Sequence, residues 1–539
     1  MENQQAVSAK ATLEEDQRFS RSHLWTLQRR FFEQRTARAW SEGVVPHYVT
    51  NNPFLARSYG RVLTGFLRDW QPKIDPAQPV YVVELGAGSG RLGYHLLQQS
   101  SKAFHLPAFR DVRVKYVMTD FSLGQVEELS RNPALRSLIE AGALDFAVFD
   151  AEAPGPLRLL HGGEVLAPGS ISNPMVVTAN YFFDSVPHDV FLVSEGELNE
   201  ALVTLNSPQE EPNPDDPEIL GRVELEFGYA PAAPEPYAEP AFNRILDGYR
   251  QTLDATHVLF PCASLRALDF LRKMSGQLLV LSADKGYVHE EALLNRGLPG
   301  LSIHGSFSMS VNFHAIAQFF RNEGGTAFSA KRRQSSLRIC VFATAGEEEL
   351  PETRHAFEEA LEVQGPDDFY TLKKALEEAA PNLAIEQILA FLRFSGWDAG
   401  IFSIVFPRLM DLLPELDELV RKELSRAARQ VWENYLPIGE DRDLAFELGV
   451  LLSEIERLPE ALEFFGHSLR LQGPDAATYY NIGICHARLR QFGPALRAVE
   501  EALAREPNYP EARSLRIQLL AESDDAATAP HIGSSAVGP

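Results

Sequence analysis

Positive charge is scarce in this sequence of 539 residues. Lysine and arginine together number 50, against 74 aspartates and glutamates, which gives a formal net charge of −24. A surface that binds nucleic acid needs clustered cations to neutralise phosphates, whereas an acidic protein repels them. The composition therefore argues against a nucleic-acid partner.

Cysteine and long apolar runs are also scarce. The three cysteines, Cys262, Cys340 and Cys485, lie far apart, so the sequence predicts neither a disulfide framework nor a metal site. No apolar run approaches the roughly 20 residues that a membrane-spanning helix needs. Residues 1–20 are polar and acidic, unlike a secretory signal. We therefore expect a cytoplasmic protein without a membrane span.

What the sequence does contain, from about residue 45 to 346, is an alternation of strand-like apolar runs and helix-like segments. This alternation predicts a mostly parallel sheet covered by helices on both faces, which is a Rossmann-like α/β domain. Residues 1–44 are expected to form an N-terminal leader that runs into a helix. The predicted strands are residues 80–85, 114–120, 144–150, 175–180, 277–283 and 336–343.

A β-rich insertion is predicted at about residues 188–240. Residues 189–206 and 221–229 have strand patterns that do not belong to the parallel core. Residues 207–240 also hold two acidic, proline-rich stretches, SPQEEPNPDDPE and APAAPEPYAEP. Because proline cannot join the interior of a sheet, these stretches are expected to form an exposed insertion or flap.

The rest of the chain, residues 347–522, is predicted to be a helical domain. Gly449 and Gly483 are 34 residues apart, and Leu469 and Leu503 have the same spacing. The pattern resembles the tetratricopeptide repeat, in which each unit is a pair of helices and several units stack to bury a core. Residues 523–539 are expected to be a disordered tail.

A glycine-rich turn carries the main functional signal. One predicted strand ends at Glu84, and Gly86, Gly88 and Gly90 follow before a helix begins. Glycines let a ligand approach the backbone, and the helix start offers free N–H groups. Gly88, Gly90 and Gly93 also fit the G-x-G-x-x-G pattern of dinucleotide enzymes. Because Gly86 follows the strand directly, the register favours a class I methyltransferase that binds S-adenosyl-L-methionine (SAM).

Polar residues close the neighbouring predicted strands. Asp120 is placed to accept from both ribose hydroxyls, Asp150 from the adenine amino group, and Asn180 lies beside the expected methyl group. In open α/β sheets ligands bind at the carboxyl ends of the strands. The alternative is that Asp120 and Asp150 only cap helices. The predicted cofactor-binding residues are Glu84, Gly86, Ala87, Gly88, Gly90, Asp120, Phe121, Asp150, Ala151 and Asn180.

Four candidates for catalysis lie at the end of the predicted strand 175–180 and in the segment that follows it. Asp184 is the predicted base or orienting group, because a nitrogen or oxygen nucleophile must lose a proton during methyl transfer. Asn180 is expected to hold the acceptor, and Tyr181 to form an aromatic wall or donate its hydroxyl. His188 is a candidate proton relay. The structural alternatives are a helix cap for Asp184, core packing for Tyr181 and a buried structural role for His188.

Four stretches resemble the MidA-type methyltransferases, a group that includes an arginine-methylating assembly factor of mitochondrial complex I. They are residues 48–67, 84–92, 179–193 and 304–325. The resemblance implies a class I fold and SAM binding. Tyr181 and Asn312 stand where that family usually has glutamate and aspartate. Since a guanidinium pairs best with carboxylates, these changes weaken the case for arginine as the acceptor.

The sequence thus predicts a SAM-dependent methyltransferase that N-methylates a protein or peptide side chain recruited by the repeats. A small-molecule methyltransferase and a non-catalytic SAM-binding scaffold remain as alternatives. Self-association into a homo-oligomer is an alternative role for the repeats. The identity of the acceptor and of the methylated atom cannot be deduced from the residues.

Overall fold

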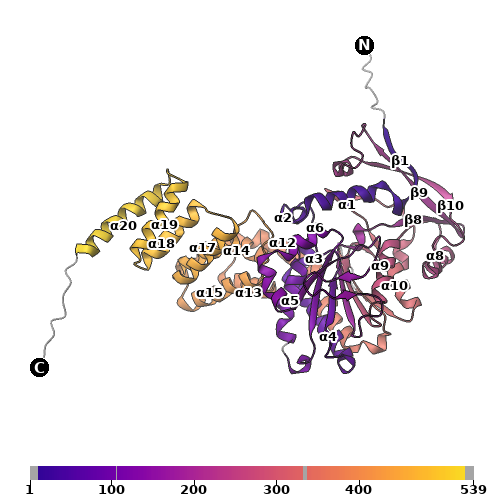
Figure 1. Cartoon of the computed structure of the whole chain (residues 1–539), viewed down its shortest axis with the longest axis horizontal. Helices are drawn as coiled ribbons and strands as arrows, with labels where there is room; N and C mark the ends of the chain where they lie inside the picture. The colour runs from indigo at the N-terminus through magenta and orange to yellow at the C-terminus, as the bar shows by residue number, and fades with distance from the viewer. Residues whose placement is uncertain (1–9, 105, 332–336, 529–539) are drawn as a thin grey trace, which may run out of the picture. The chain divides into compact units, whose positions relative to one another are not determined.

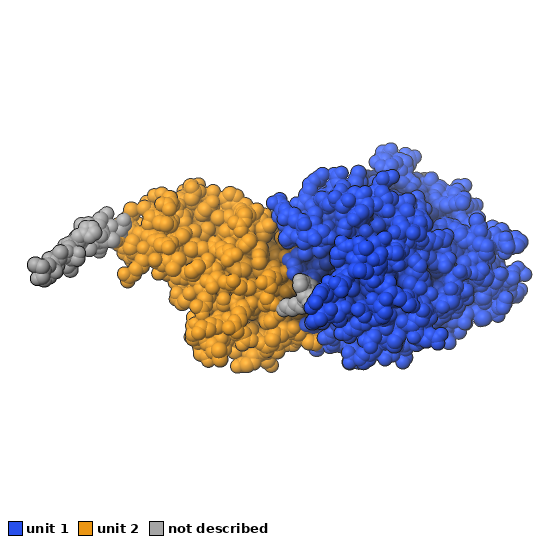
Figure 2. Space-filling model, turned by 60° about the horizontal axis from the view of Figure 1, so that its bottom comes forward, with its two compact units in different colours: residues 1–372 blue, residues 373–539 orange. Residues whose placement is uncertain are grey.

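The computed structural model describes residues 10–104, 106–331 and 337–528 (Figure 1). It forms two compact units, residues 1–372 and 373–539 (Figure 2). The boundary lies later than the one expected after residue 346. Helix α11 (Pro351–Phe357) packs on α4 (Pro53–Trp70), where the Asp69 carboxylate accepts hydrogen bonds from the backbone N–H groups of Glu352 and Thr353. The chain therefore completes the first unit before it enters the helical one.

The first unit is built on a seven-stranded mixed sheet with the order β17-β18-β12-β7-β2-β3-β4. Five neighbouring strands are parallel, and β18 runs antiparallel to both β12 and β17. The six predicted strands are confirmed, and the edge strand β17 is additional. The bounds are β2 (Val80–Glu84), β3 (Val114–Asp120), β4 (Leu144–Val148), β7 (Met175–Asn180), β12 (Leu278–Asp284), β17 (Thr326–Ser329) and β18 (Arg338–Ala343).

Helices cover this sheet, as the ribbon shows (Figure 1). All residues of β2 and β12 are buried, which explains why each strand begins with four consecutive apolar residues rather than an alternating pattern. The helices of the first unit besides α4 and α11 are α1 (His23–Arg35), α2 (Arg38–Ser41), α3 (Tyr48–Asn51), α5 (Arg91–Phe104), α6 (Leu123–Ser130), α7 (Arg136–Glu140), α8 (Pro240–Thr252), α9 (Cys262–Arg272) and α10 (Phe313–Asn322); α12 (Pro366–Ala379) crosses the boundary between the units.

A second, antiparallel sheet joins the predicted insertion to the N-terminal segment. Its order is β1-β9-β8-β11, and β10 also pairs with β9. Strand β1 lies within residues 1–44, so this part of the chain is more than a leader and a helix. Its sequence is acidic and none of its residues is buried, so it lacks the apolar pattern that predicts a strand. The bounds are β1 (Ala11–Arg18), β8 (Asp189–Ser194), β9 (Glu197–Ser207), β10 (Glu224–Pro231) and β11 (Thr256–Phe260).

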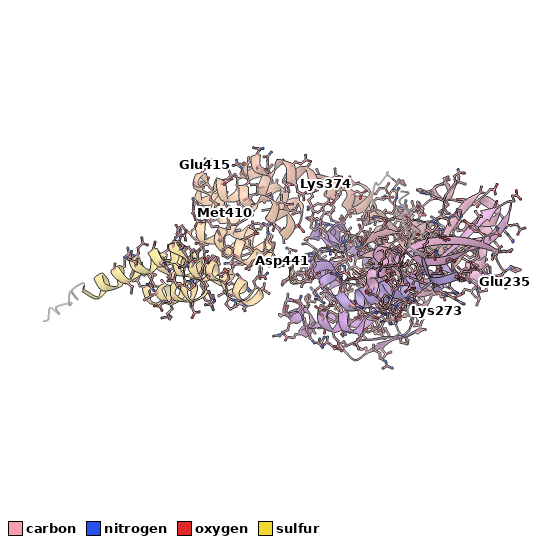
Figure 3. The ribbon with its side chains drawn as sticks, turned by 90° about the horizontal axis from the view of Figure 1, so that it is seen from above. Glu235, Lys273, Lys374, Met410, Glu415 and Asp441 are labelled. Carbon is pink, nitrogen blue, oxygen red and sulfur yellow. The ribbon has the colours of Figure 1, made fainter. Side chains whose placement is uncertain are left out.

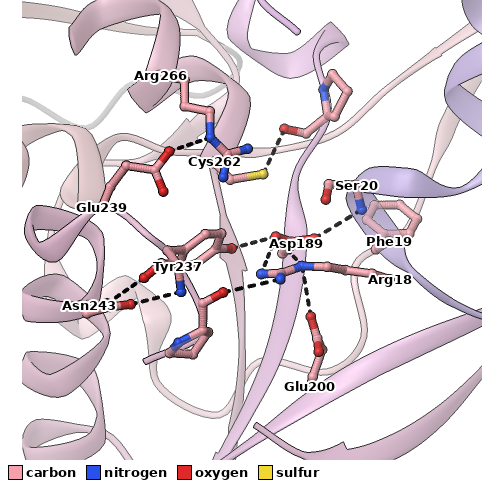
Figure 4. Close-up of polar contacts among 12 residues, drawn as sticks. Arg18, Phe19, Ser20, Asp189, Glu200, Tyr237, Glu239, Asn243, Cys262 and Arg266 are labelled. Atoms are coloured by element: carbon pink, nitrogen blue, oxygen red, sulfur yellow. Dashed lines mark hydrogen bonds and ion pairs between the residues drawn. The ribbon is translucent and has the colours of Figure 1, made fainter. Parts of the chain in front are cut away.

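A buried ionic cluster fastens β1 to this sheet (Figure 4). Arg18 pairs with Asp189 at 2.9 Å and with Glu200 at 2.9 Å, and its guanidinium lies 4.6 Å from the centre of the Tyr237 ring. The Tyr237 hydroxyl donates to Asp189 at 2.5 Å. The cluster fixes the chain immediately before α1, and so it determines where α1 begins.

One of the two proline-rich stretches is only partly exposed, because a residue of this cluster lies in it. Glu235 and most residues around it are exposed, as expected (Figure 3). Tyr237 in the second stretch is instead buried, and its ring stacks on Phe260 with centroids 5.1 Å apart. One aromatic residue therefore anchors an otherwise exposed segment.

The second unit consists of helices that follow one another through short turns. Gly449 and Gly483 lie at helix crossings: a Cβ added to either would come within 2.7 Å of Phe465 or Val499, respectively. Helix α20 extends six residues into the predicted disordered tail, so the tail does not begin at residue 523 as expected. Residues 529–539 lie outside the described part. The bounds are α13 (Ile385–Phe394), α14 (Ala399–Leu412), α15 (Glu418–Glu433), α16 (Leu444–Glu454), α17 (Leu458–Leu471), α18 (Ala476–Arg488), α19 (Phe492–Arg505) and α20 (Pro510–Thr528).

In the described part of the chain, none of the helices combines the length and apolar character that crossing a membrane requires.

Candidate functional site

A cavity of about 200 Å³ opens at the carboxyl ends of the central strands. Most of the residues predicted from the sequence line it. Two do not: Gly90 and His188 are absent from the lining. The predicted residues that line the cavity are Glu84, Gly86, Ala87, Gly88, Asp120, Phe121, Asp150, Ala151, Asn180, Tyr181 and Asp184.

The glycine turn has the backbone geometry that the sequence implied. Gly86, Gly88 and Gly90 have φ angles of 61°, 52° and 73°, which are strained for any residue with a Cβ. A Cβ on Gly88 would lie 2.9 Å from the Trp40 ring. A Cβ on Gly90 would instead meet Leu129 and Met118, so Gly90 shapes the turn and its packing rather than the cavity wall. Its predicted contact with the cofactor stays a prediction.

Glu84 lies beneath the turn and is almost fully buried, at 4% exposure. The Tyr116 hydroxyl donates to its carboxyl at 3.0 Å, and the Thr119 hydroxyl donates to its backbone carbonyl at 2.7 Å. Burial raises the pKa of Glu84 to about 8, although the Tyr116 bond opposes this. Glu84 therefore holds a proton at neutral pH and adds little negative charge to the cavity.

Asp120 and Asp150 line the same cavity but have different partners. Asp120 accepts from the backbone N–H of Ser122 at 3.1 Å, and burial raises its pKa to about 6. Asp150 forms a bidentate ion pair with Arg29. The two terminal nitrogens of Arg29 donate to the two carboxylate oxygens of Asp150 at 3.0 and 2.9 Å. The same guanidinium lies 4.5 Å from the centre of the Phe121 ring. A carboxylate can accept about four hydrogen bonds, so Asp150 keeps acceptor capacity for a ligand.

Asn180 and Tyr181 are more constrained than predicted. The Asn180 side chain accepts from the Tyr59 hydroxyl at 2.8 Å and donates to the Thr50 carbonyl at 2.9 Å. Its amide is thus already used to hold α3 and α4 against the strand end. Tyr181 has a φ angle of 49°, a left-handed conformation that costs a non-glycine residue on the order of 1 kcal/mol or more. Both residues still line the cavity.

Asp184 has a carboxyl partner that the sequence analysis did not identify. Its backbone N–H donates to the Asp284 carboxyl group at 3.1 Å, and both side chains are buried. The Ser185 hydroxyl donates to Asp184 at 2.7 Å. Burial raises the pKa of both carboxyls. Asp284 is the last residue of β12. The sequence signal that could have identified it is that a fifth strand also ends in a polar residue.

His188 is not placed to relay protons to the cavity. Its side chain is fully buried, and Nε2 lies 2.8 Å from the Phe183 carbonyl. Burial lowers its pKa to about 4, so the ring stays neutral at physiological pH. These contacts favour the structural alternative for His188, and its catalytic role stays a prediction. His304, by contrast, lines the cavity.

The N-terminal segment supplies one wall of the cavity. Trp25, Gln28, Arg29 and Phe32 line it from α1 at the i, i+3, i+4, i+7 spacing of one helix face. Trp40 follows from α2 and stacks on Phe32, with centroids 5.9 Å apart. The sequence analysis missed this wall because nothing in a single helix pattern shows which distant cavity it will face.

Comparison with known proteins bears on the same region. Residues 64–325 match a family model described as "Putative S-adenosyl-L-methionine-dependent methyltransferase". The match spans somewhat less than half of the chain and includes the glycine turn and the strand ends. It supports a SAM-dependent methyltransferase with SAM as the cofactor. None of the curated proteins matches the sequence.

Three solved structures share part of the chain's shape. A Burkholderia thailandensis protein bound to S-adenosyl-homocysteine has a TM-score of 0.37 at 14% identity, covering 55% of this chain and 77% of its own. An uncharacterized protein from the same organism has a TM-score of 0.39 at 14% identity, covering 60% and 86%. The CMeT domain of the citrinin polyketide synthase has a TM-score of 0.23 at 12% identity, covering 51% and 48%. Likenesses this weak bear on neither fold nor function.

Proposed function

We propose that this chain is a class I SAM-dependent methyltransferase that methylates a nitrogen atom of a protein or peptide side chain. The observation that carries the proposal is a cavity at the strand ends that is lined together by the glycine turn, Asp120, Asp150 and Asp184. Polar groups from several strands converge there although they are far apart in the sequence. Such convergence at the carboxyl edge of a parallel sheet is typical of a ligand site.

The residues present fit the cofactor. A Cβ at Gly88 would lie 2.9 Å from the Trp40 ring, so a larger residue here would displace that ring from the cavity wall. Asp120 would accept from the ribose hydroxyls, and Asp150 and Phe121 would form the nucleoside wall with Arg29. When bound, the cofactor supplies an electrophilic methyl group on a sulfonium. The chain's own contribution is to align the acceptor with that methyl group and to receive the acceptor's proton.

The sheet order supports the class I assignment. Five parallel strands form a Rossmann-like α/β core, and one reversed strand, β18, together with the edge strand β17 extends it on one side. The glycine turn follows β2, which has parallel neighbours on both sides. This central position is where the first turn of such folds places its ligand.

The protein or peptide acceptor is proposed from the second unit. Its helical pairs repeat at 34 residues, and glycines allow close crossings at equivalent positions, as in tetratricopeptide repeats. Stacks of this kind bind peptides and helices. A cytoplasmic location is part of the proposal. The three cysteines are free, and thiols stay reduced in the cytoplasm.

The test uses SAM labelled with tritium in the methyl group. The full chain is incubated with labelled SAM and an extract of its source cells, and the extract is then separated into acid-precipitable and soluble fractions. Enzyme-dependent label in the precipitate is the expected result. Label confined to the soluble fraction would reject a protein acceptor, and calorimetry that shows no heat with SAM would reject the function as a whole.

A further inference from the structure

The carboxyl pair of Asp184 and Asp284 is the most unusual group of charges at the cavity. Asp184 is 4% exposed and Asp284 is fully buried. Two ionised carboxylates repel each other strongly when they are taken out of water, and neither can donate a hydrogen bond to the other. The Asp184 N–H donates to the Asp284 carboxyl group at 3.1 Å, so the two buried acidic residues are held next to each other. Because two negative charges this close are not both stable out of water, one of the two carboxyl groups carries a proton.

The two residues are placed unequally. Asp184, on the turn after β7, lines the cavity, whereas Asp284, at the end of β12, lies behind it. Asp284 accepts from the backbone N–H groups of Lys285 at 2.9 Å and Asp184 at 3.1 Å. Its position is therefore set by backbone groups, and through it the position of Asp184. Asp184 can touch a ligand, and Asp284 can act only through Asp184.

We propose that Asp184 and Asp284 hold one proton between them and form the proton acceptor for a methyl acceptor that carries its own hydrogen, either N–H or O–H. This inference rests on the proposed function and narrows its substrate class. Asp184 is the catalytic residue in this arrangement, and Asp284 is a positioning residue. The elements packed around the pair contribute the titratable or charged groups Tyr59, Tyr181, Lys285, His304, Cys340 and Asp367.

The charges balance in such a step. Methyl transfer forms a bond from the acceptor atom to the methyl carbon and breaks the carbon–sulfur bond, whose electron pair stays on sulfur. The acceptor's proton passes to Asp184. Before the step the sulfonium is positive and the pair carries one negative charge; afterwards the thioether is neutral and both carboxyls are protonated. The buried site stays neutral overall, which avoids the cost of an uncompensated buried charge.

The same balance excludes another class of acceptor. A carboxylate acceptor has no proton to lose and would bring a second negative charge next to the pair. Ester formation on a carboxylate is therefore not the reaction that this arrangement serves. Burial raises the pKa of both carboxyls, which brings the pair's titration towards neutral pH, where a general base is most effective.

The test needs no acceptor, because SAM and S-adenosyl-homocysteine (SAH) differ in one methyl group and one positive charge. Calorimetric titrations of the full chain at pH 7, in buffers with different ionisation enthalpies, give the number of protons taken up on binding. SAH lacks the sulfonium that balances the ionised pair. We expect SAH binding to take up more protons than SAM binding, by up to about one.

Asp284→Asn and Asp184→Asn each remove the shared proton, and either should abolish the difference between SAH and SAM. If one variant fails to fold, the other decides the outcome. The matched control is Asp145→Asn, another buried aspartate that accepts backbone N–H bonds but does not line the cavity. It should keep the difference.

Equal proton uptake for SAH and SAM in the unmodified protein would overturn the inference. A difference that persists in both Asp variants would assign the protons to Glu84 or Asp120 and overturn it as well. The absence of heat with either ligand would instead reject the proposed function, so the two failures are distinguishable.

Discussion

Arg29 offers the sharpest test of the N-terminal wall. Its guanidinium makes two charge-assisted hydrogen bonds to Asp150, pairs with Glu152 at 3.0 Å and covers the Phe121 ring. Replacing it with alanine leaves Asp150 and Phe121 without the group that orients them. We expect Arg29→Ala to weaken binding of SAM and SAH alike, because both ligands have the same nucleoside.

The size of the effect follows from the contacts and their exposure. A hydrogen bond to a charged group contributes about 1.5–3 kcal/mol when it is buried. The Arg29 and Asp150 side chains are 32% and 26% exposed, so solvent screening reduces this value. A loss of about 1.4 kcal/mol corresponds to roughly tenfold weaker binding. Arg29→Lys keeps the charge but loses the bidentate geometry, so its affinity should be intermediate.

The assay is isothermal calorimetry with both ligands, and the control lies next to Arg29 on the same helix. Arg30 pairs with Asp215 at 2.7 Å and does not line the cavity. Arg30→Ala removes an equivalent ion pair and should leave affinity within about twofold. Equal affinities for Arg29→Ala and Arg30→Ala, with both variants folded, would refute the assignment of Arg29 to the cofactor wall.

Three further predictions concern stability. Glu84 has a pKa of about 8 when folded, so its ionisation costs stability as pH rises from about 4.5 to 8. In urea titrations the unfolding free energy of Glu84→Gln should therefore rise relative to that of the wild type by up to about 5 kcal/mol across that range. His188 has a pKa of about 4 when folded, so its protonation costs stability as pH falls from 6.5 to 4. This loss of unfolding free energy, up to about 3 kcal/mol, should be absent in His188→Gln in the same titrations. Gly449→Leu should lower the unfolding free energy by about 2 kcal/mol because Phe465 is 2.7 Å from the added Cβ. Gly466→Ala in α17, where the Cβ meets only the tip of Arg470 at 3.5 Å, should leave the unfolding free energy unchanged in the same urea titrations.

Local sequence was enough to predict the central sheet. Residues 80–83 and 278–281 are apolar throughout, and strands buried on both faces need such runs wherever they lie in the fold. The glycine turn was equally predictable, because a left-handed backbone at Gly86 and Gly88 can hardly be built from other residues. Asp120 and Asp150 could be placed at the cavity because parallel strands end at the same edge.

Other features had no such local signature. Strand β1 is polar and acidic, and it becomes a strand because Arg18 meets Asp189 and Glu200 from a segment about 170 residues away. The boundary between the units was misplaced because α11 packs back on α4 through Asp69. Long-range contacts decide such features, and no window of sequence contains both partners.

The sequence by itself determined the sheet, the turn and the residue types at its edge, since these depend on backbone sterics and on the apolar pattern of each strand. Only the tertiary structure decided what those residues do. In it, His188 is buried away from the cavity, and the Asn180 amide is hydrogen-bonded to Tyr59 and Thr50. The Asp284 carboxyl group accepts a hydrogen bond from the Asp184 backbone. The physical reason is that hydrogen-bond partners and desolvation are set by neighbours in space, and these come from elements far apart along the chain.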